Sequence, residues 1–274
     1  MDSRYLDPDA MVTKEKVPAY RLIPAARFHL LTPAFDLMCA LMGLGARFTE
    51  RVVRTVRVPL NARVLDAGCG SGRVALAVKF RSPDAEVIGL DGDPHILTLA
   101  RRKADRRDLD VEFFEGLIEA MPFPDESFDL VFTVLVLHHL PEKAKVGACR
   151  EMFRVVRPGG RVIIADFGPP HGWRATLVAA VMRWFEQTAE NFAGRIPQML
   201  HDSGFDPLRE TFHTAWSITC LEGSKDSAVT GAPIAGARQI GRDVGDGLPE
   251  PSIADSPKMP FAALEGEQLR TFSW

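Results

Sequence analysis

The stretch that decides the fold is Val64-Leu65-Asp66-Ala67-Gly68-Cys69-Gly70-Ser71-Gly72-Arg73. A short apolar run ends in an acid, three glycines follow at alternate positions, and a segment of helical character begins at once. Glycine lets a chain turn sharply and brings bare backbone N–H groups close to a ligand. The stretch therefore predicts a strand, a tight loop and a helix N-terminus that together cradle a nucleoside cofactor.

The spacing of these glycines separates two classes of cofactor site. A dinucleotide site has the pattern G-x-G-x-x-G/A. Counted from Gly68, its third small residue falls on Arg73, whereas the third glycine of this chain is Gly72, one place earlier. The spacing G-x-G-x-G after an acid resembles that of the class I S-adenosylmethionine (SAM) methyltransferases. A nicotinamide-dependent oxidoreductase is the disfavoured alternative.

Size and composition indicate one globular domain of ordinary core size with an appendage. The chain has 274 residues, of which 46% are hydrophobic and 25% charged. Its net charge of -3 supplies no basic field, so nucleic acid is a disfavoured partner. The four cysteines form no C-x-x-C pair, which predicts reduced thiols, a cytoplasmic protein and no metal site. No apolar run is long enough for a transmembrane helix.

Apolar runs alternate with helical patterns from residue 63 onwards. We expect strands over 63–66, 86–91, 111–114, 128–134, 161–166, 208–213 and 215–221, and helices over 28–56, 73–80, 94 onwards, 142–156, 172–185 and 196–203. This alternation predicts an α/β fold with a doubly wound, mostly parallel, seven-stranded sheet that is Rossmann-like. The expected domains are an N-terminal arm and helical lid (1–56), a SAM-binding methyltransferase domain (57–222) and a disordered tail (223–274).

Four blocks between residues 62 and 166 resemble, in the right order, the class I SAM methyltransferases of the methyltransferase-11 type. They are the glycine loop, the acid Asp91 that ends the second strand, the segment 115–129 and the segment 152–166. The resemblance implies that Asp66 holds the loop and the amino group of SAM, and that Asp91 accepts both ribose hydroxyls. It assigns SAM contacts to Asp66, Gly68, Cys69, Gly70, Gly72, Asp91, Gly92, Leu117, Ile118, Glu119, Thr133 and Val134.

One position departs from the pattern of the family. The acid that binds the adenine amino group in the resembling proteins is replaced here by Leu117. The backbone of Ile118, the carboxylate of Glu119 or packing of Leu117 on the ring face are the alternatives that remain for holding adenine.

Methyl transfer from a sulfonium is an in-line displacement that mainly requires alignment of the acceptor. A base is needed only where the acceptor must lose a proton, and a histidine titrates in a suitable range. Candidates near the strand ends are His138, His139, Asp166 and His171, of which His138 is the leading one. Asp166 is expected to be a structural or polar pocket residue.

The acceptor is expected to be a small hydrophobic or aromatic molecule, quinol-like or a specialised metabolite. The N-terminal segment around Phe35-Asp36 resembles the start of the ubiquinone and menaquinone C-methyltransferases, where such a pair lies in a helical lid. Phe35, His138 and His139 are therefore the expected substrate contacts. The apolar segment 173–185 is either core or a peripheral membrane contact. A phospholipid amine N-methyltransferase and a non-catalytic SAM sensor or scaffold are the alternative functions, and the oligomeric state is left open.

Overall fold

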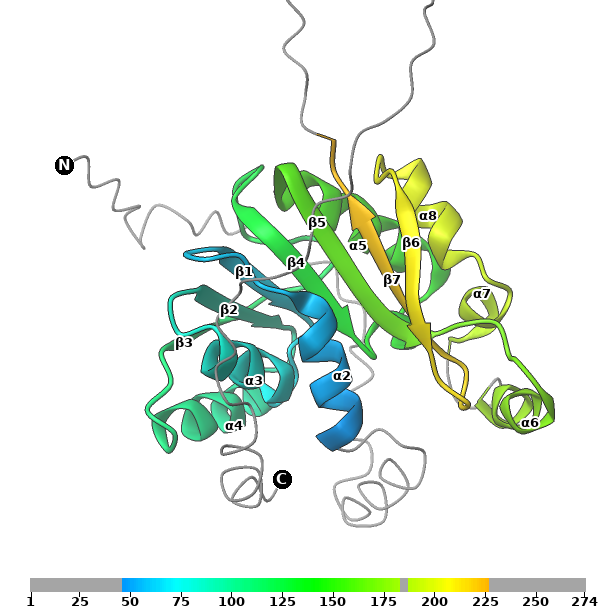
Figure 1. Ribbon diagram of the computed structural model, residues 1–274, viewed down its shortest axis with the longest axis horizontal. Helices are drawn as coiled ribbons and strands as arrows, with labels where there is room; N and C mark the ends of the chain where they lie inside the picture. The colour runs from blue at the N-terminus through cyan, green and yellow to red at the C-terminus, as the bar shows by residue number, and fades with distance from the viewer. Residues whose placement is uncertain (1–45, 183–186, 227–274) are drawn as a thin grey trace, which may run out of the picture. The chain divides into compact units, whose positions relative to one another are not determined.

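A computed structural model describes residues 46–182 and 187–226, which form one sheet flanked by helices (Figure 1). The predicted lid around Phe35 and the tail from residue 227 lie outside the described residues. Of the predicted helix 28–56, the described part is α2 (Ala46–Val56).

The sheet has seven strands in the order β3-β2-β1-β4-β5-β7-β6. Strand β7 is antiparallel to both of its neighbours, and the other strand pairs are parallel. The strands are β1 (Arg63–Ala67), β2 (Glu86–Asp91), β3 (Val111–Glu115), β4 (Phe128–Val134), β5 (Val156–Phe167), β6 (Leu208–His213) and β7 (Ile218–Ser224). The predicted doubly wound, mostly parallel sheet is thereby confirmed.

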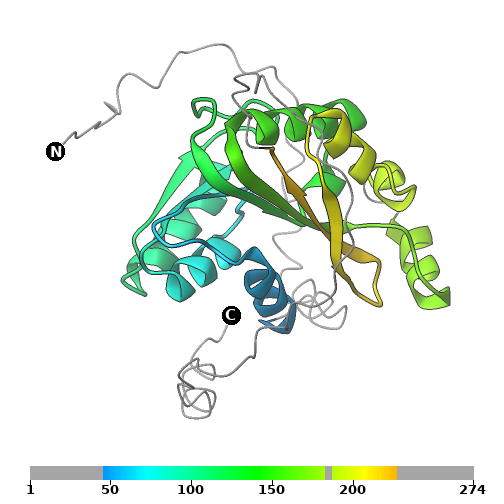
Figure 2. The ribbon, with the colours of Figure 1, turned by 45° about the horizontal axis from the view of Figure 1, so that its top comes forward.

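Helices cover both faces of the sheet (Figures 1 and 2). On one face, α2 and α3 (Arg73–Arg81) share an apolar cluster with β1, β4 and β5. On the other face, α5 (Glu142–Val155) and α8 (Ile196–Asp202) pack on the opposite side chains of the same strands. A third cluster joins α4 (Pro94–Asp105) to β3. The sheet is therefore buried on both sides, which is why Phe128–Val134 is a nearly continuous apolar run.

Strand β5 begins earlier than the predicted 161–166. The segment Arg157-Pro158-Gly159-Gly160 was expected to separate helix from strand, but α5 ends at Val155 and β5 starts at Val156. An irregularity in the pairing of β4 with β5 accommodates this segment between Phe128 and Leu130. Gly159 also donates its N–H to the carbonyl of Lys225, which draws the early part of the strand into the sheet.

The hairpin of β6 and β7 was predicted, but the second strand is displaced along the sequence. Residues 214–217 form a turn in which Thr214 Oγ1 accepts hydrogen bonds from the N–H groups of Trp216 and Ile218. Ser217 adopts a positive φ of 63°, so the expected start of the strand at residue 215 was wrong. Strand β7 instead continues to Ser224, two residues into the range expected to be tail.

Three short or shifted elements complete the described chain. They are η3 (Leu137–His139), α6 (Trp173–Met182) and α7 (Ala189–Phe192). The sequence predicted α6 approximately but gave no sign of η3 or α7, because a single turn has no periodicity to read. In an open sheet of this kind, ligands bind beyond the carboxyl ends of the strands. Asp66, Asp91 and Val134 all lie at or near that edge.

Candidate cofactor and active site

The glycine loop between β1 and α3 depends on three residues with positive φ. Gly68, Gly70 and Gly72 have φ of 80°, 52° and 75°. The loop is held to the neighbouring strand because the N–H groups of Gly68 and Cys69 both donate to the carbonyl of Leu90, at 2.7 and 2.9 Å. A Cβ at Gly68 would lie 2.5 Å from a methyl group of Val136. No side chain fits there, because the loop packs directly on Val136, and the positive φ values and this close contact together require glycine.

Asp91 organises the loop from the end of β2. Its Oδ2 accepts the N–H of Gly70 at 2.8 Å, and its Oδ1 accepts the N–H of Asp93 at 3.0 Å. Asp93, not Asp91, caps α4, by accepting the N–H of His95 at 2.8 Å. Each oxygen of the Asp91 carboxylate has a further lone pair. The carboxylate is therefore held at the sheet edge with acceptor capacity to spare.

Asp66 is a buried carboxylate beneath the loop. It is 2% exposed, and its Oδ2 accepts the N–H of Ala75 in α3 at 3.1 Å. Burial raises the pKa of Asp66 well above its usual value, and the charge of Asp91 acts in the same direction, while the N–H of Ala75 opposes both. A cation placed next to this carboxylate would relieve the cost of burying its charge.

A cavity of about 210 Å³ opens at this point. It is lined by Phe48, Thr49, Asp66, Gly68, Cys69, Gly70, Arg73, Val74, Val134 and Leu135. The structure thus brings together five of the predicted cofactor residues: Asp66, Gly68, Cys69, Gly70 and Val134. The sequence did not point to Phe48 and Thr49 of α2, although the predicted N-terminal helix placed apolar side chains next to the site.

Other predicted cofactor residues lie outside the lining of this cavity. Leu117 is half-buried and pairs with Ala120 across a tight turn after β3. Ile118 is 6% exposed and belongs to the apolar core under α5. Glu119 packs against α5, since a Cβ at Gly147 would come within 3.1 Å of its Cβ. Thr133 is buried in β4, and its Oγ1 has no hydrogen-bond partner within the described residues.

A second polar centre lies at the ends of β4 and β5. His138 Nδ1 is 2.9 Å from Asp166 Oδ1, and both side chains are buried. The ring of His138 contacts the ring of His139, with centroids 3.9 Å apart, and meets Phe167 edge to face. His171, the remaining candidate, is exposed and stacks on His213. The structure therefore singles out His138 and His139 among the predicted bases.

Asp166 is the anchor of this centre. Its carboxylate accepts hydrogen bonds from the backbone N–H groups of residues 136, 137 and 167, from the Nδ2 of Asn191 and from the ring of His138. Burial works against ionisation of Asp166, but the charge and hydrogen bond of His138 and the N–H of Phe167 hold its pKa below the usual value. The carboxylate is therefore ionised and fixes the orientation of the imidazole.

Helix α7 is held next to this centre by an ion pair with a buried lysine of α5, which the sequence did not suggest. Lys145 of α5 is 0% exposed and donates to Glu190 Oε2 at 2.7 Å and to the carbonyl of Gln187. This ion pair holds α7 on α5, and α7 in turn presents Asn191 to Asp166. A lysine in the first turn of an amphipathic helix is normally solvent-facing, so no pattern in the sequence marks this one.

The described part of the chain lacks a membrane-spanning helix and a metal-binding cluster. Within it, no helix has the length and apolarity to cross a membrane. It also contains no group of three or more His, Cys, Asp or Glu side chains arranged to hold a metal ion.

One known protein family matches the part of the chain that contains the glycine loop and the buried Asp66. Residues 64–160 match the family described as a methyltransferase domain. Residues 64–160 therefore form a methyltransferase domain, and the sheet around them has the fold of the class I SAM-dependent methyltransferases. SAM is therefore the cofactor that the residues of this site are expected to hold.

Curated relatives match this chain over different lengths. A demethylmenaquinone methyltransferase from Thermus thermophilus is 39% identical over 145 residues, which are 52% of this chain and 65% of that protein. One from Listeria welshimeri is 28% identical over 212 residues, which are 68% of this chain and 89% of that protein. The chain spans 65% of the length of the relatives from Thermus and from Deinococcus radiodurans.

Solved structures support the fold. A putative S-adenosyl-L-methionine-dependent methyltransferase from Methanococcus maripaludis superposes with a TM-score of 0.54 at 18% identity, over 72% of this chain and 93% of that one. A SAM-dependent methyltransferase from Aquifex aeolicus gives 0.50 at 18% identity, over 64% of this chain and 88% of that one. At this identity the likeness concerns the fold.

Proposed function

We propose that this protein binds SAM at the glycine loop and transfers its methyl group to a small quinol-like acceptor. The observation that carries the proposal is the buried carboxylate of Asp66, which lines the cavity and has the N–H of Ala75 as its hydrogen bond. A buried anion of this kind favours a cationic ligand group. The α-amino group of SAM is such a cation.

The chain's other residues fit the remaining parts of the cofactor. Gly68 and Gly70 of the glycine loop line the same cavity as Asp66 and present main chain without a side chain to it. Asp91 has spare lone pairs for two ribose hydroxyls, in a charge-assisted arrangement. When bound, SAM supplies an electrophilic methyl group and a neutral thioether as the leaving group. We assign the predicted contacts of Cys69, Gly92, Ile118, Thr133 and Val134 to this same site.

His138 is the proposed base for the acceptor. Donation of its Nδ1–H to Asp166 leaves Nε2 as an acceptor, in the tautomer that can take a proton. SAM, held by Asp66, Asp91 and the glycine loop, would supply the methyl group to the acceptor and retain the electron pair of the broken bond on its sulfur. The proton that the acceptor loses passes to Nε2 of His138. His139, stacked on His138, is the proposed neighbour of the acceptor ring.

The acceptor class rests on the named relatives, which are demethylmenaquinone methyltransferases. Quinols are apolar and partition into membranes. In agreement with that chemistry, α6 leaves Trp173 and Leu177 largely exposed, one turn apart on its surface. We include peripheral contact of α6 with a lipid surface in the proposal, as the route by which an apolar acceptor is reached.

The test is calorimetric binding of SAM and S-adenosylhomocysteine, with NAD as control, followed by a methyl-transfer assay with a demethylmenaquinol. We expect binding of both adenosyl compounds, no binding of NAD, and methylated quinol as product. Asp91→Ala is expected to lose most of the affinity for both adenosyl compounds. Failure of the protein to bind either compound overturns the cofactor assignment. Binding without transfer to the quinol, but with transfer to a phospholipid amine, overturns the acceptor assignment alone.

A further inference from the structure

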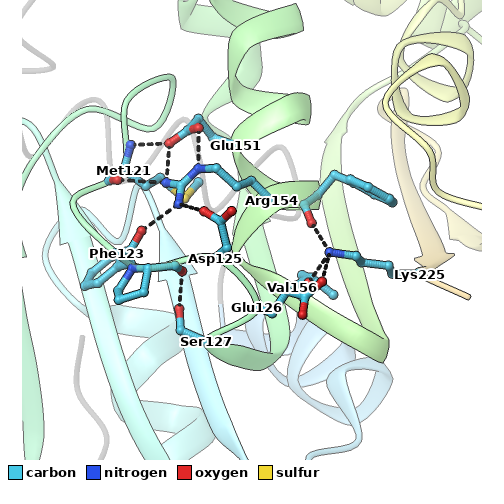
Figure 3. A network of polar contacts seen from close by, with 11 residues as sticks. Met121, Phe123, Asp125, Glu126, Ser127, Glu151, Arg154, Val156 and Lys225 are labelled. Atoms are coloured by element: carbon cyan, nitrogen blue, oxygen red, sulfur yellow. Dashed lines mark hydrogen bonds and ion pairs between the residues drawn. The ribbon is translucent and has the colours of Figure 1, made fainter. Parts of the chain in front are cut away.

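The turn that follows β3 is held from outside by two side chains of α5. Immediately after this turn, the N–H of Met121 donates to Glu151 Oε2 at 2.7 Å, and the carbonyl of Met121 accepts from Arg154 Nη2 at 3.0 Å. Figure 3 shows both groups converging on the same residue from one helix. The main chain of Met121 is thus fixed by the side chains of Glu151 and Arg154, which lie one helical turn apart.

Arg154 extends this hold along the loop. Its Nη1 donates to the carbonyl of Phe123 at 2.7 Å and to the carboxylate of Asp125 at 2.8 Å, and its guanidinium forms a two-point contact with Glu151. The hydrogen bond with Glu151 raises the pKa of Arg154 against the opposing effect of burial, and Asp125 adds to the rise. The guanidinium fork is the geometry that can satisfy these partners at once.

The helix that carries the pair is itself fixed where it ends. Lys225 Nζ donates to the carbonyl of Phe153 at 3.0 Å. It also donates to the carbonyl of Val156 at 2.8 Å, as Figure 3 shows. Lys225 also exchanges backbone hydrogen bonds with Gly159 and Gly160. The position of Arg154 is therefore set by the sheet and not only by its own helix.

The other side of the turn is tied to the proposed ribose site. Gly116 donates its N–H to the carbonyl of Asp91 at 3.0 Å, and the N–H of Ala120 bonds to the carbonyl of Leu117 at 3.1 Å. The four residues 117–120 thus lie between Asp91 at one end and the Glu151–Arg154 pair at the other. Leu117 contributes no polar side-chain atom, and Glu119 packs against Gly147 of α5, so we assign recognition of a polar nucleobase edge here to the main chain.

We propose that Glu151 and Arg154 are positioning residues that fix the main chain of residues 117–121 against the nucleobase of the cofactor. The inference rests on the proposed function, because it takes the ligand at Asp91 to be a nucleoside. Neither side chain needs to touch the ligand. Their role is to hold the N–H and carbonyl groups of the turn in one arrangement, which a mobile turn without a carboxylate could not keep.

The experiment compares Arg154→Lys with Arg161→Lys. Lysine keeps the charge and loses the fork, and Arg161 is a matched site because it pairs with Glu222 and binds main-chain carbonyls away from the turn. Binding of S-adenosylhomocysteine and of S-inosylhomocysteine is measured by calorimetry, because the two differ only at the nucleobase edge. We expect Arg154→Lys to lower the preference for the adenosyl compound about ten-fold, the worth of one hydrogen bond between the nucleobase and the main chain, and Arg161→Lys to leave it unchanged.

Amide hydrogen exchange gives a readout that does not require the ligand. Faster exchange confined to residues 116–123 is expected in Arg154→Lys and in Glu151→Gln, which serves if the first variant folds poorly. Equal loss of affinity for both compounds, or unchanged exchange in these residues, overturns the inference while the proposed function stands. If the wild-type protein binds neither compound, the cofactor assignment falls and this inference falls with it.

Discussion

His138 Nδ1 lies 2.9 Å from Asp166 Oδ1, in a contact where the two side chains are 7% and 3% exposed. The residues come from different elements, a single turn after β4 and the end of β5, and adjacent strands bring them together. Asp166 also accepts the N–H groups of Val136 and Leu137, so it fixes the turn that carries His138 as well as the imidazole. One carboxylate thereby sets both the place and the tautomer of the proposed base.

The first prediction concerns Asp166→Asn. Both oxygens of the Asp166 carboxylate accept hydrogen bonds, whereas an amide has one acceptor oxygen, so the variant loses the bond either to the imidazole or to the turn that carries it. The kcat for methyl transfer is therefore expected to fall by about 100-fold or more, the usual contribution of a general base. Affinity for S-adenosylhomocysteine, measured by calorimetry, is expected to change little. Asp129→Asn is the matched control, because Asp129 binds the N–H of Arg63 at the opposite end of the strands.

Asp166→Asn is also expected to change how the stability of the protein depends on pH, in a direction that the pKa of Asp166 fixes. The pKa of Asp166 is lowered in the folded protein, so its stabilising contribution is present above the usual value of 3.8 and is lost as the pH falls through the lower folded value. The difference in Tm between wild type and Asp166→Asn should therefore be full at neutral pH and should narrow in acid below that value. A difference that grows in acid would contradict the assignment.

Asp66→Asn is expected to separate stability from binding. The pKa of Asp66 is raised by burial, so the ionised form costs folding free energy above its folded value, and the cost disappears as the pH falls towards 3.8. Removing that charge should raise the Tm of the cofactor-free protein at pH 8 by about 2–4 °C, the shift that 1 kcal/mol gives in a domain of this size. Affinity for SAM should drop about ten-fold or more, because the α-amino group loses its anion. Scanning calorimetry and titration calorimetry measure the two effects, and a variant that loses both would contradict the assignment.

Gly68→Ala tests the glycine loop against a matched glycine. Gly68 and Gly172 both have positive φ, at 80° and 87°, but a Cβ at Gly68 would lie 2.5 Å from Val136, whereas at Gly172 it meets nothing within 4 Å. Gly172→Ala should cost only backbone strain, about 1 kcal/mol. Gly68→Ala should cost roughly 3 kcal/mol by adding overpacking, and should abolish cofactor binding. Urea denaturation of both variants checks the difference, and equal losses would show that contact with Val136 is unimportant.

Much of the fold was predictable because the elements with strong patterns are local. Strands Glu86–Asp91 and Phe128–Val134 have the predicted bounds, since acids bracket the apolar run of the first and the second is a nearly continuous apolar run that begins after Ser127. The early start of β5 was not predictable, because Pro158 and the two glycines after it break local propensity, and pairing across the sheet overrides them.

The parts of the candidate site that lie within one sequence motif were predictable. The parts that form where distant segments of the chain meet were not. The glycine loop and Asp91 follow from spacing, and the structure places them together. The hydrogen bond from Asn191 to Asp166 joins residues 25 positions apart through a four-residue helix, and nothing in the sequence ranks that asparagine above another. The role proposed for Arg154 was missed for the same reason, because two of its partners are main-chain carbonyls, which every residue possesses.

Leu117→Asp is expected to strengthen nucleobase binding. A carboxylate at this position would accept a hydrogen bond from the adenine amino group, as the resemblance to the family implies. The gain in affinity for S-adenosylhomocysteine should be about ten-fold, the worth of one hydrogen bond to a charged group. S-inosylhomocysteine, which lacks the amino donor, should gain nothing. A gain that is equal for the two compounds would place residue 117 away from the nucleobase edge.

The pair Lys145–Glu190 is expected to respond unequally to loss of each partner. Lys145 is 0% exposed, whereas Glu190 is 19% exposed, so only the carboxylate can recover hydration when its partner is removed. Glu190→Ala leaves a buried ammonium with one carbonyl acceptor and should cost about 3 kcal/mol of unfolding free energy. Lys145→Met removes the buried charge itself and should cost roughly 1 kcal/mol, with the thioether filling the space.

Since α7 carries Asn191 to Asp166, Glu190→Ala should also lower kcat, and the double variant should be more stable than Glu190→Ala alone. Urea denaturation of the three variants decides the order, and a larger loss for Lys145→Met would show that the ammonium is stabilised by groups other than Glu190.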